Sequence, residues 1–265
     1  MLPPLRFVTY LAPNVRPVYE YVARVTGERL GIATELVDGS SCDRFAQGEG
    51  DVAFVCGLPY VELASGPDRP FELLGAPVLT GERYEDRPIY FSDVIVRAGS
   101  EIGSFMELRG RSWSYNEPHS HSGYAVTRAH LAAIGEPKGF FGRVVEAGYH
   151  QRSIELVRNG AVDASAIDSQ VLEVEMRAHP GLRNELRVIG TLGPSTIQPV
   201  VAASHLAQDL KAGLREVILG IGAAPEDGEA LARGLVARYV PVEDPDYDDI
   251  REMVAAADKA GVEWC

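Results

Sequence analysis

The chain has 265 residues, of which 46% are hydrophobic and 24% charged, a composition typical of a globular protein with one or two domains. Its 38 acidic residues outnumber the 25 basic ones, and the net charge of −13 disfavours nucleic acids and anionic membranes as partners. A small anion is not excluded as a ligand, because backbone N–H groups at a helix N-terminus can outweigh net charge locally.

No segment is apolar enough to predict a membrane span, and the longest apolar run is only Val217–Ala224. The first ten residues lack a basic start followed by an apolar stretch, so no secretion signal is predicted. The chain is therefore expected to be either cytoplasmic or a mature form that starts at a new Met. The three cysteines, Cys42, Cys56 and Cys265, follow no pairing pattern and predict no disulfide framework.

The first third of the chain alternates short apolar strands with helical patterns. Strands are expected at 5–9, 32–37, 51–56 and 73–79, with helices at 15–31 and from Pro59. This rhythm indicates parallel β-α-β units and an α/β fold.

A long extended run, 87–97, breaks this rhythm, and a second α/β set follows it. Its strands are expected at 112–115, 143–146, 164–167 and 187–190, and its helices at 122–134, 152–158 and 169–178. A second extended run, 198–203, then leads to a helix capped by Ser204 and to helical stretches at 228–239 and 248–260.

Two extended crossings predict one lobe inserted into another. Residues 1–91 and 199–265 are expected to form lobe 1, and residues 92–198 lobe 2. A cleft between two such lobes is the default place for a small ligand. Closure of the lobes would be a hinge motion at the two crossings.

The most informative segment is Tyr115–Tyr124, at a predicted strand end that opens a helix. Ser120, Ser122 and Gly123 offer hydroxyls and backbone N–H groups there, the arrangement that binds tetrahedral oxyanions. The alternative is that Ser120 serves only as the helix N-cap, which is the commoner role of such a serine.

Three further polar side chains follow predicted strands. His121 forms a His-x-His pair with His119, and with Glu117 nearby this pair could hold a metal. No further ligand follows at a suitable spacing, so no metal site and no cofactor are predicted. His150 could donate to an anion or act as an acid or base. Asp168 could accept from a ligand amine, or simply cap the next helix.

Tyr10, Tyr60 and Tyr90 each occupy a predicted strand end or crossing. Tyrosines there could line a cleft, while half-buried core tyrosines are the commoner case.

Taken together, these segments resemble the phosphonate-, phosphite- and phosphate-binding proteins of ABC transporters. The resemblance runs from about residue 5 to 210 and is carried by 51–57, 90–96, 108–113, 120–124, 139–142, 146–150 and 193–199. It implies a two-lobed type II periplasmic-binding-protein fold with two hinge crossover strands.

The resemblance also implies a ligand site. It implies that Ser120, His121 and Ser122 clasp the oxyanion with Gly123, that His150 assists, and that Asp168 can hold the amine of an aminoalkyl phosphonate. Tyr90 and, less closely, Tyr10 match tyrosines that flank the ligand. His121 departs from the family pattern, in which the middle residue of the clasp is often small or hydroxylated.

The expected function is therefore that of a monomeric solute-binding protein that presents a small phosphorus oxyanion to an ABC transporter permease. The family implies a periplasmic or extracytoplasmic location, and because no signal peptide is seen the cytoplasm stays an open alternative. The alternative is a cytoplasmic enzyme on the same scaffold that acts on a small carboxylate or on a thiamine or menaquinone precursor, since His121, His150 and Asp168 are titratable. A third alternative is a ligand-sensing subunit that reports to a regulator.

Overall fold

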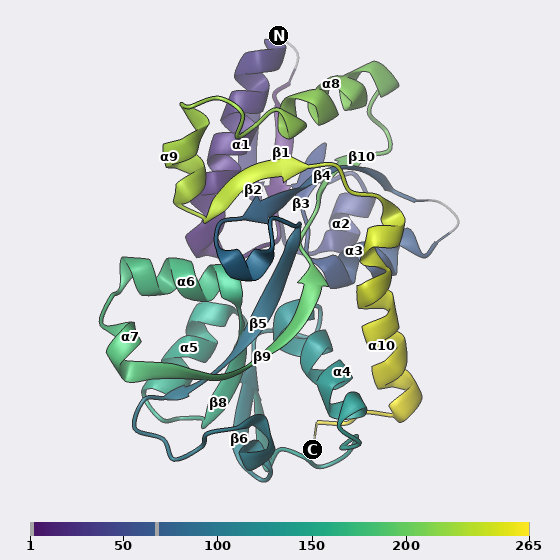
Figure 1. Ribbon diagram of the computed structural model, residues 1–265. Coiled ribbons are helices and arrows are strands. Elements are labelled where there is room, and N and C mark those ends of the chain that lie inside the picture. The colour runs from purple at the N-terminus through teal and green to yellow at the C-terminus, as the bar shows by residue number, and fades with distance from the viewer. Residues whose placement is uncertain (1–2, 67–68, 265) are drawn as a thin grey trace. The chain divides into compact units, whose positions relative to one another are not determined.

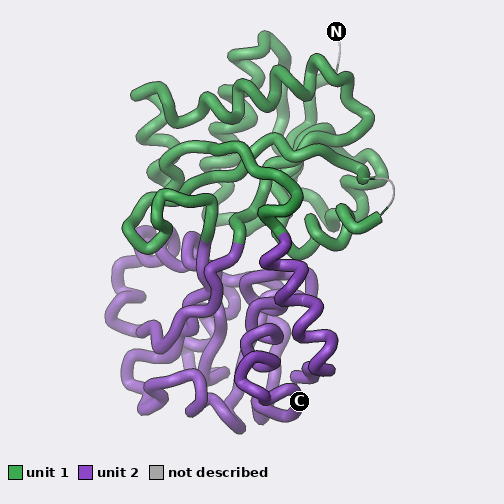
Figure 2. The backbone as a smooth tube through the Cα atoms, turned by 45° about the vertical axis from the view of Figure 1, so that its right-hand side comes forward, with its two compact units in different colours: residues 1–89, 196–247 green, residues 90–195, 248–265 purple. Residues whose placement is uncertain are grey.

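The computed structural model describes residues 3–66 and 69–264, which divide into two compact units (Figure 2). Unit 1 comprises the described residues up to Ile89 together with Thr196–Tyr247, and unit 2 comprises Tyr90–Ser195 together with the described residues from Asp248 onward. The chain therefore passes between the units three times. The expected division kept 199–265 in one lobe, whereas the residues from 248 onward pack in unit 2.

Unit 1 is built around a six-stranded sheet with the order β11-β4-β10-β3-β1-β2 (Figure 1). Its strands are β1 (Leu5–Thr9), β2 (Thr34–Asp38), β3 (Val52–Phe54), β4 (Phe71–Leu79), β10 (Val200–Ala203) and β11 (Val236–Val240). Strand β1 runs parallel to β2 and β3, while β10 is antiparallel to β3 and β4. The parallel part confirms the β-α-β units expected from the sequence.

The helices of unit 1 are short except for two. They are α1 (Arg16–Leu30), α2 (Cys42–Ala46), α3 (Gly57–Ala64), α8 (Gln208–Leu219) and α9 (Asp227–Ala232), with 3-10 turns η1 (Pro13–Val15), η2 (Glu82–Tyr84) and η5 (Asp244–Tyr247). Helix α1 buries Val18, Val22 and Val25, the apolar stripe that predicted it, and ends at Gly31 in the left-handed conformation.

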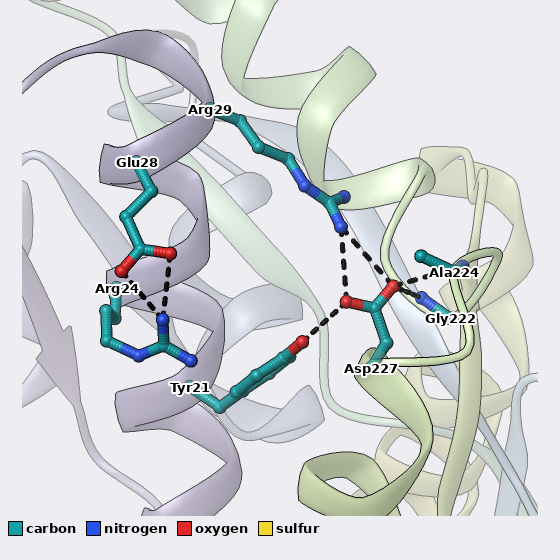
Figure 3. A network of polar contacts seen from close by, with 7 residues as sticks. All are labelled: Tyr21, Arg24, Glu28, Arg29, Gly222, Ala224 and Asp227. Atoms are coloured by element: carbon teal, nitrogen blue, oxygen red, sulfur yellow. Dashed lines mark hydrogen bonds and ion pairs between the residues drawn. The ribbon is translucent and has the colours of Figure 1, made fainter.

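A buried carboxylate fastens α1 to the segment that leads into α9 (Figure 3). The Asp227 side chain is fully buried and accepts hydrogen bonds from the Tyr21 hydroxyl at 2.5 Å and the Gly222 backbone N–H at 2.7 Å, and it pairs with Arg29 at 3.1 Å. Burial acts to raise the pKa of this carboxyl, but these hydrogen bonds and the arginine outweigh it and hold the pKa below its usual range. These donors therefore stabilise the charged form of the buried carboxylate.

Two expectations for unit 1 are wrong. The stretch 228–239 is not one helix, because α9 ends at Ala232 and, after Leu235 adopts a positive φ of 62°, β11 pairs with β4. Ser204 does not cap α8, whose N-cap residue is Ala207; the Ser204 backbone N–H donates instead to the Pro70 carbonyl.

Unit 2 is built around a five-stranded sheet with the order β7-β6-β8-β5-β9. Its strands are β5 (Ile89–Arg97), β6 (Ser112–Tyr115), β7 (Arg143–Glu146), β8 (Ala164–Asp168) and β9 (Leu186–Thr196). Strand β6 is parallel to β7 and β8, while β5 is antiparallel to β8. Strand β9 extends beyond the expected 187–190, so the second passage between units falls between Ser195 and Thr196, before the run 198–203 that was expected to form it.

Helices and strands of unit 2 share one hydrophobic core. The helices are α4 (Val126–Ala133), α5 (His150–Arg158), α6 (Ser169–Ala178), α7 (Leu182–Glu185) and α10 (Asp248–Ala260), with a 3-10 turn η3 (Phe105–Leu108) and a π-helical turn η4 (His121–Ala125). Helix α10 packs against α4, where Arg128 pairs with Asp258 at 3.0 Å. The buried Trp113 stacks on Phe141 with ring centroids 4.7 Å apart.

No helix within the described parts of the chain has the length and the apolar character needed to cross a bilayer.

Candidate functional site

The candidate site lies at one edge of the unit 2 sheet, where the three parallel strands end. Strand β6 leads into the turn 120–125, β7 leads into α5 at His150, and β8 ends at Asp168. Strand β5 is antiparallel to β8 and pairs Ser92 with Asp168, which brings Tyr90 to the same edge. Ligands of α/β sheets bind where parallel strands end. The structure therefore brings together, at one edge, the predicted site residues of unit 2.

The turn after β6 begins at Ser120, as expected for a helix start. The Ser120 hydroxyl accepts a hydrogen bond from the Gly123 backbone N–H at 3.1 Å, so Ser120 is an N-cap. Its own O–H remains a donor in addition to this cap. Ser120, His121 and Ser122 are all buried. The first-turn N–H groups of a helix have no intrahelical acceptor, which makes this turn suited to an anion.

Gly123 is required by the close approach of a neighbouring side chain. A Cβ atom at this position would lie 1.8 Å from the Asn116 Oδ1 atom and 2.9 Å from its Cγ atom. Asn116 is itself buried. Its backbone carbonyl accepts a hydrogen bond at 2.7 Å from the backbone N–H of Gly148, which lies in the segment before α5. Any side chain at position 123 would therefore disturb both segments of the site.

Ser122 and His150 join the two helix starts directly. The Ser122 Oγ atom lies 3.0 Å from the His150 Nε2 atom, and His150 is the first residue of α5, whose start has no side-chain cap. Burial lowers the pKa of His150 to about 4, so its imidazole is neutral near pH 7. The buried Nδ1 atom has no hydrogen-bond partner among the described residues. A neutral imidazole in this position can offer a donor or an acceptor to a ligand.

His121 is directed into the interior of unit 2. Its side chain is fully buried, and its Nε2 atom lies 2.8 Å from the Oγ atom of Ser195 on β9. The Tyr90 ring lies 6.4 Å away between centroids, and burial lowers the His121 pKa to about 4. One imidazole nitrogen is thus committed to β9. The sequence analysis did not predict Ser195 as a site residue, although the segment 193–199 that contains it is one of those that carry the family resemblance.

Asp168 caps α6. Its Oδ1 atom accepts from the backbone N–H groups of Gln170 at 2.8 Å and Val171 at 3.3 Å, and the residue is buried. The capping alternative is therefore shown for Asp168. Its carboxylate also lies at the sheet edge that carries His150 and the turn 120–125, which we call the clasp turn.

Tyr10 and Tyr60 belong to unit 1 and contact residues of their own unit. The Tyr10 hydroxyl donates to Glu49 at 2.7 Å, and burial together with this carboxylate raises its pKa above the usual range. The buried Tyr60 donates to Asp244 at 2.8 Å. The structure does not place these two tyrosines in the unit that carries the other predicted site residues.

The His-x-His pair does not assemble a metal site within residues 3–66 and 69–264, where no group of three or more His, Cys, Asp or Glu side chains is placed to hold a metal ion. His119 is exposed, whereas His121 is turned toward Ser195.

Two α/β units, each with its own sheet, are the architecture of the type II periplasmic-binding-protein fold. Solved structures confirm this fold. A binding-protein component of a phosphonate ABC transporter from Pseudomonas aeruginosa is 19% identical, with a TM-score of 0.84 over 98% of this chain and 88% of that chain. PhnD1 from Prochlorococcus marinus, solved with methylphosphonate, is 18% identical, with a TM-score of 0.82 over 96% of this chain and 98% of that chain.

A family model identifies the protein family to which the chain belongs. The model described as the phosphonate periplasmic substrate-binding protein of ABC transporters matches residues 10–247. The chain belongs to this family. Membership implies a small-molecule ligand and an ABC transporter as partner, and it confirms the resemblance drawn from the sequence. The family consists of binding proteins, so the alternative of an enzyme is not supported.

Proposed function

We propose that this protein binds a small phosphorus oxyanion, such as a phosphonate, phosphite or phosphate, at the strand-end edge of unit 2 and presents it to the transporter. The observation that carries the proposal is the hydrogen bond between Ser122 and His150, which joins two helix N-termini at 3.0 Å. Each start contributes backbone N–H groups and a partial positive charge, which together suit a tetrahedral anion.

The donors of this site are neutral. The hydroxyls of Ser120 and Ser122, the N–H groups of the turn and the uncharged imidazole of His150 would share the charge of the ligand. Hydrogen bonds to an ionised acceptor are stronger than those between neutral groups, which makes hydroxyls and amides sufficient for an anion in a buried setting. His121 lies within the same turn, but its Nε2 atom is hydrogen-bonded to Ser195. In this proposal His121 therefore supports the turn and does not bind the ligand through that nitrogen.

Two further residues complete the proposed site. Tyr90, at the start of β5, would flank the ligand from beside His121. The Asp168 carboxylate would supply the counter-charge for the ammonium group of an aminoalkyl phosphonate while it caps α6. The family resemblance and the phosphonate named with one solved relative support this assignment.

The experiment is a thermal-shift and calorimetric screen against methylphosphonate, 2-aminoethylphosphonate, phosphite and phosphate, with sulfate and acetate as comparison anions. A ligand at about 100 times its dissociation constant adds about 2.7 kcal/mol of stability, which a melting curve resolves. Stabilisation by a phosphorus oxyanion supports the proposal. Stabilisation by acetate alone, or by none of the six, contradicts it.

Ser122→Ala tests the assignment of the site. Loss of one hydroxyl to a charged ligand costs about 1–3 kcal/mol of binding, which corresponds to about a 5- to 150-fold weaker dissociation constant. The matched control is Ser165→Ala, because Ser165 is a buried serine of β8 whose hydroxyl donates to the Ser114 carbonyl at 2.7 Å within the sheet. Equal affinities of the two variants would contradict the assignment.

A further inference from the structure

His121 contacts a residue that no sequence motif paired with it. Its Nε2 atom lies 2.8 Å from Ser195 Oγ, and that oxygen lies 3.8 Å from the Met253 sulfur of α10. The Tyr90 ring lies 6.4 Å from the His121 ring, between centroids. All four side chains belong to unit 2, and both His121 and Tyr90 are almost completely buried. His121 of the clasp turn is therefore enclosed by β5, β9 and α10.

In the sequence, these neighbours lie close to the points where the chain passes between the units. Tyr90 is the first residue of unit 2 after the first passage, and Ser195 is the last residue of unit 2 before the second passage. Met253 lies in α10, which begins at Asp248, directly after the third passage. The His121 imidazole thus contacts, directly or through Ser195, the unit 2 residues that border the first two passages and the helix that follows the third.

The contact restricts what His121 can do for a ligand. A neutral imidazole has one donor and one acceptor nitrogen, and Nε2 is occupied by Ser195. The backbone of His121 remains part of the turn that holds Ser122 and Gly123. A shift of β9 at Ser195 would therefore move the clasp turn through the imidazole, and a shift of the turn would move β9.

We infer that His121 is a positioning residue, which couples occupancy of the clasp turn to the conformation of the chain passages through its hydrogen bond with Ser195. The inference rests on the proposed function, since it assigns a role to a residue of that same site. It also predicts that Ser195, which lies outside the clasp turn, contributes to ligand affinity.

The test compares Ser195→Ala, His121→Ala and the double variant, with methylphosphonate as the probe ligand, or whichever phosphorus oxyanion binds the unaltered protein. Loss of one such hydrogen bond predicts about a 5- to 10-fold weaker dissociation constant for each single variant. The double variant is expected to bind no more weakly than His121→Ala, because the two side chains act as one unit. His121→Gln, which keeps a polar group within reach of Ser195, is expected to recover part of the affinity.

The control is Thr191→Val. Thr191 lies four residues earlier on β9 and donates to Asp93 of β5 at 2.9 Å, so this variant also removes a side-chain hydrogen bond between β9 and a neighbouring element. Its affinity is expected to equal that of the unaltered protein. Unchanged affinity in Ser195→Ala, or losses in the single variants that simply add in the double variant, would overturn the inference.

A second readout separates this inference from the proposed function. If the unaltered protein binds none of the phosphorus oxyanions, the proposed function fails and the coupling is measured without ligand. Hydrogen exchange at the Gly123 and Ala125 amides, which are bonded to Ser120, is then expected to be at least fivefold faster in Ser195→Ala than in Thr191→Val. Equal exchange rates in the two variants would overturn the coupling itself.

Discussion

Gly123→Ala is the substitution that tests the geometry of the clasp turn most directly. The new Cβ atom would lie 1.8 Å from the Asn116 oxygen, whereas an ordinary contact is at least 3.4 Å, so that oxygen must retreat by about 1.6 Å. Asn116 is buried and its backbone carbonyl holds Gly148, so the space for this movement is small. The side chain and the turn must therefore share the displacement.

The magnitude follows from this displacement. Overpacking of a filled interior costs about 1–3 kcal/mol, and the better helix propensity of alanine returns about 1 kcal/mol, which leaves a net loss of up to about 2 kcal/mol in the free energy of unfolding. The effect on binding is expected to be larger than on folding, since the displaced N–H groups are those proposed to face the anion. A loss of about 1.4 kcal/mol of binding would correspond to a tenfold weaker dissociation constant.

The assay is isothermal titration with methylphosphonate, beside urea unfolding of the same preparations. Gly190→Ala is the matched control, because Gly190 lies on β9 of the same unit and an added Cβ meets no atom within 4 Å there. We expect Gly190→Ala to bind as the unaltered protein does. The reasoning is refuted if Gly123→Ala matches Gly190→Ala in both affinity and unfolding midpoint.

Three further predictions concern buried charges and buried histidines. Asp227→Asn is expected to lower the free energy of unfolding by about 2 kcal/mol in urea titrations, because it removes the charge of a buried carboxylate that accepts from Tyr21 and pairs with Arg29, and a loss below about 1 kcal/mol would contradict this. Asp168→Asn keeps a good N-cap but removes the charge, so calorimetry should show weaker 2-aminoethylphosphonate binding with methylphosphonate binding unchanged; equal effects on both would count against the assigned role. The pKa values of His121 and His150 are lowered by burial to about 4, so between pH 6.5 and 4 the unfolded chain binds protons that the native protein does not. Stability should fall on acidification in this window, by up to about 1.4 kcal/mol per pH unit for each histidine. Urea midpoints of His150→Gln should therefore decline less steeply, and a decline parallel to that of the unaltered protein would exclude this cause.

Much of the fold could be predicted because it is encoded locally. The strand at 112–115 and the helix at 248–260 were predicted with the bounds that the structure shows, since period-2 and period-3.6 patterns are read from neighbouring residues. The stretch 228–239 was mistaken because Gly234 and Leu235 break an otherwise helical pattern, and the pairing of β11 with β4 is a contact distant in sequence. An amphipathic pattern likewise predicted α10 without identifying α4 as its partner.

For the candidate site, too, the residues marked by a local sequence pattern could be predicted, and a contact distant in sequence could not. Ser120, His150 and Asp168 were found because each follows a predicted strand and starts a helix, which are properties of a few adjacent residues. Ser195 was missed because it lies 74 residues from His121, and only the folded sheet brings the two together. Tyr60 and Tyr10 matched a sequence position, but their hydroxyls are bound by Asp244 and Glu49 in unit 1.

The late position of α10 in the chain has a consequence for biosynthesis. Ala257 and Val262 belong to the core of unit 2, and Arg128 of α4 bonds to the Val262 carbonyl across 134 residues. During translation, the clasp turn therefore emerges long before the segment that closes the core around it. Unit 2 is expected to remain incomplete, with apolar surface available to chaperones, until the residues through Val262 have been synthesised. Competence to bind ligand would then arise only after α10 has been synthesised.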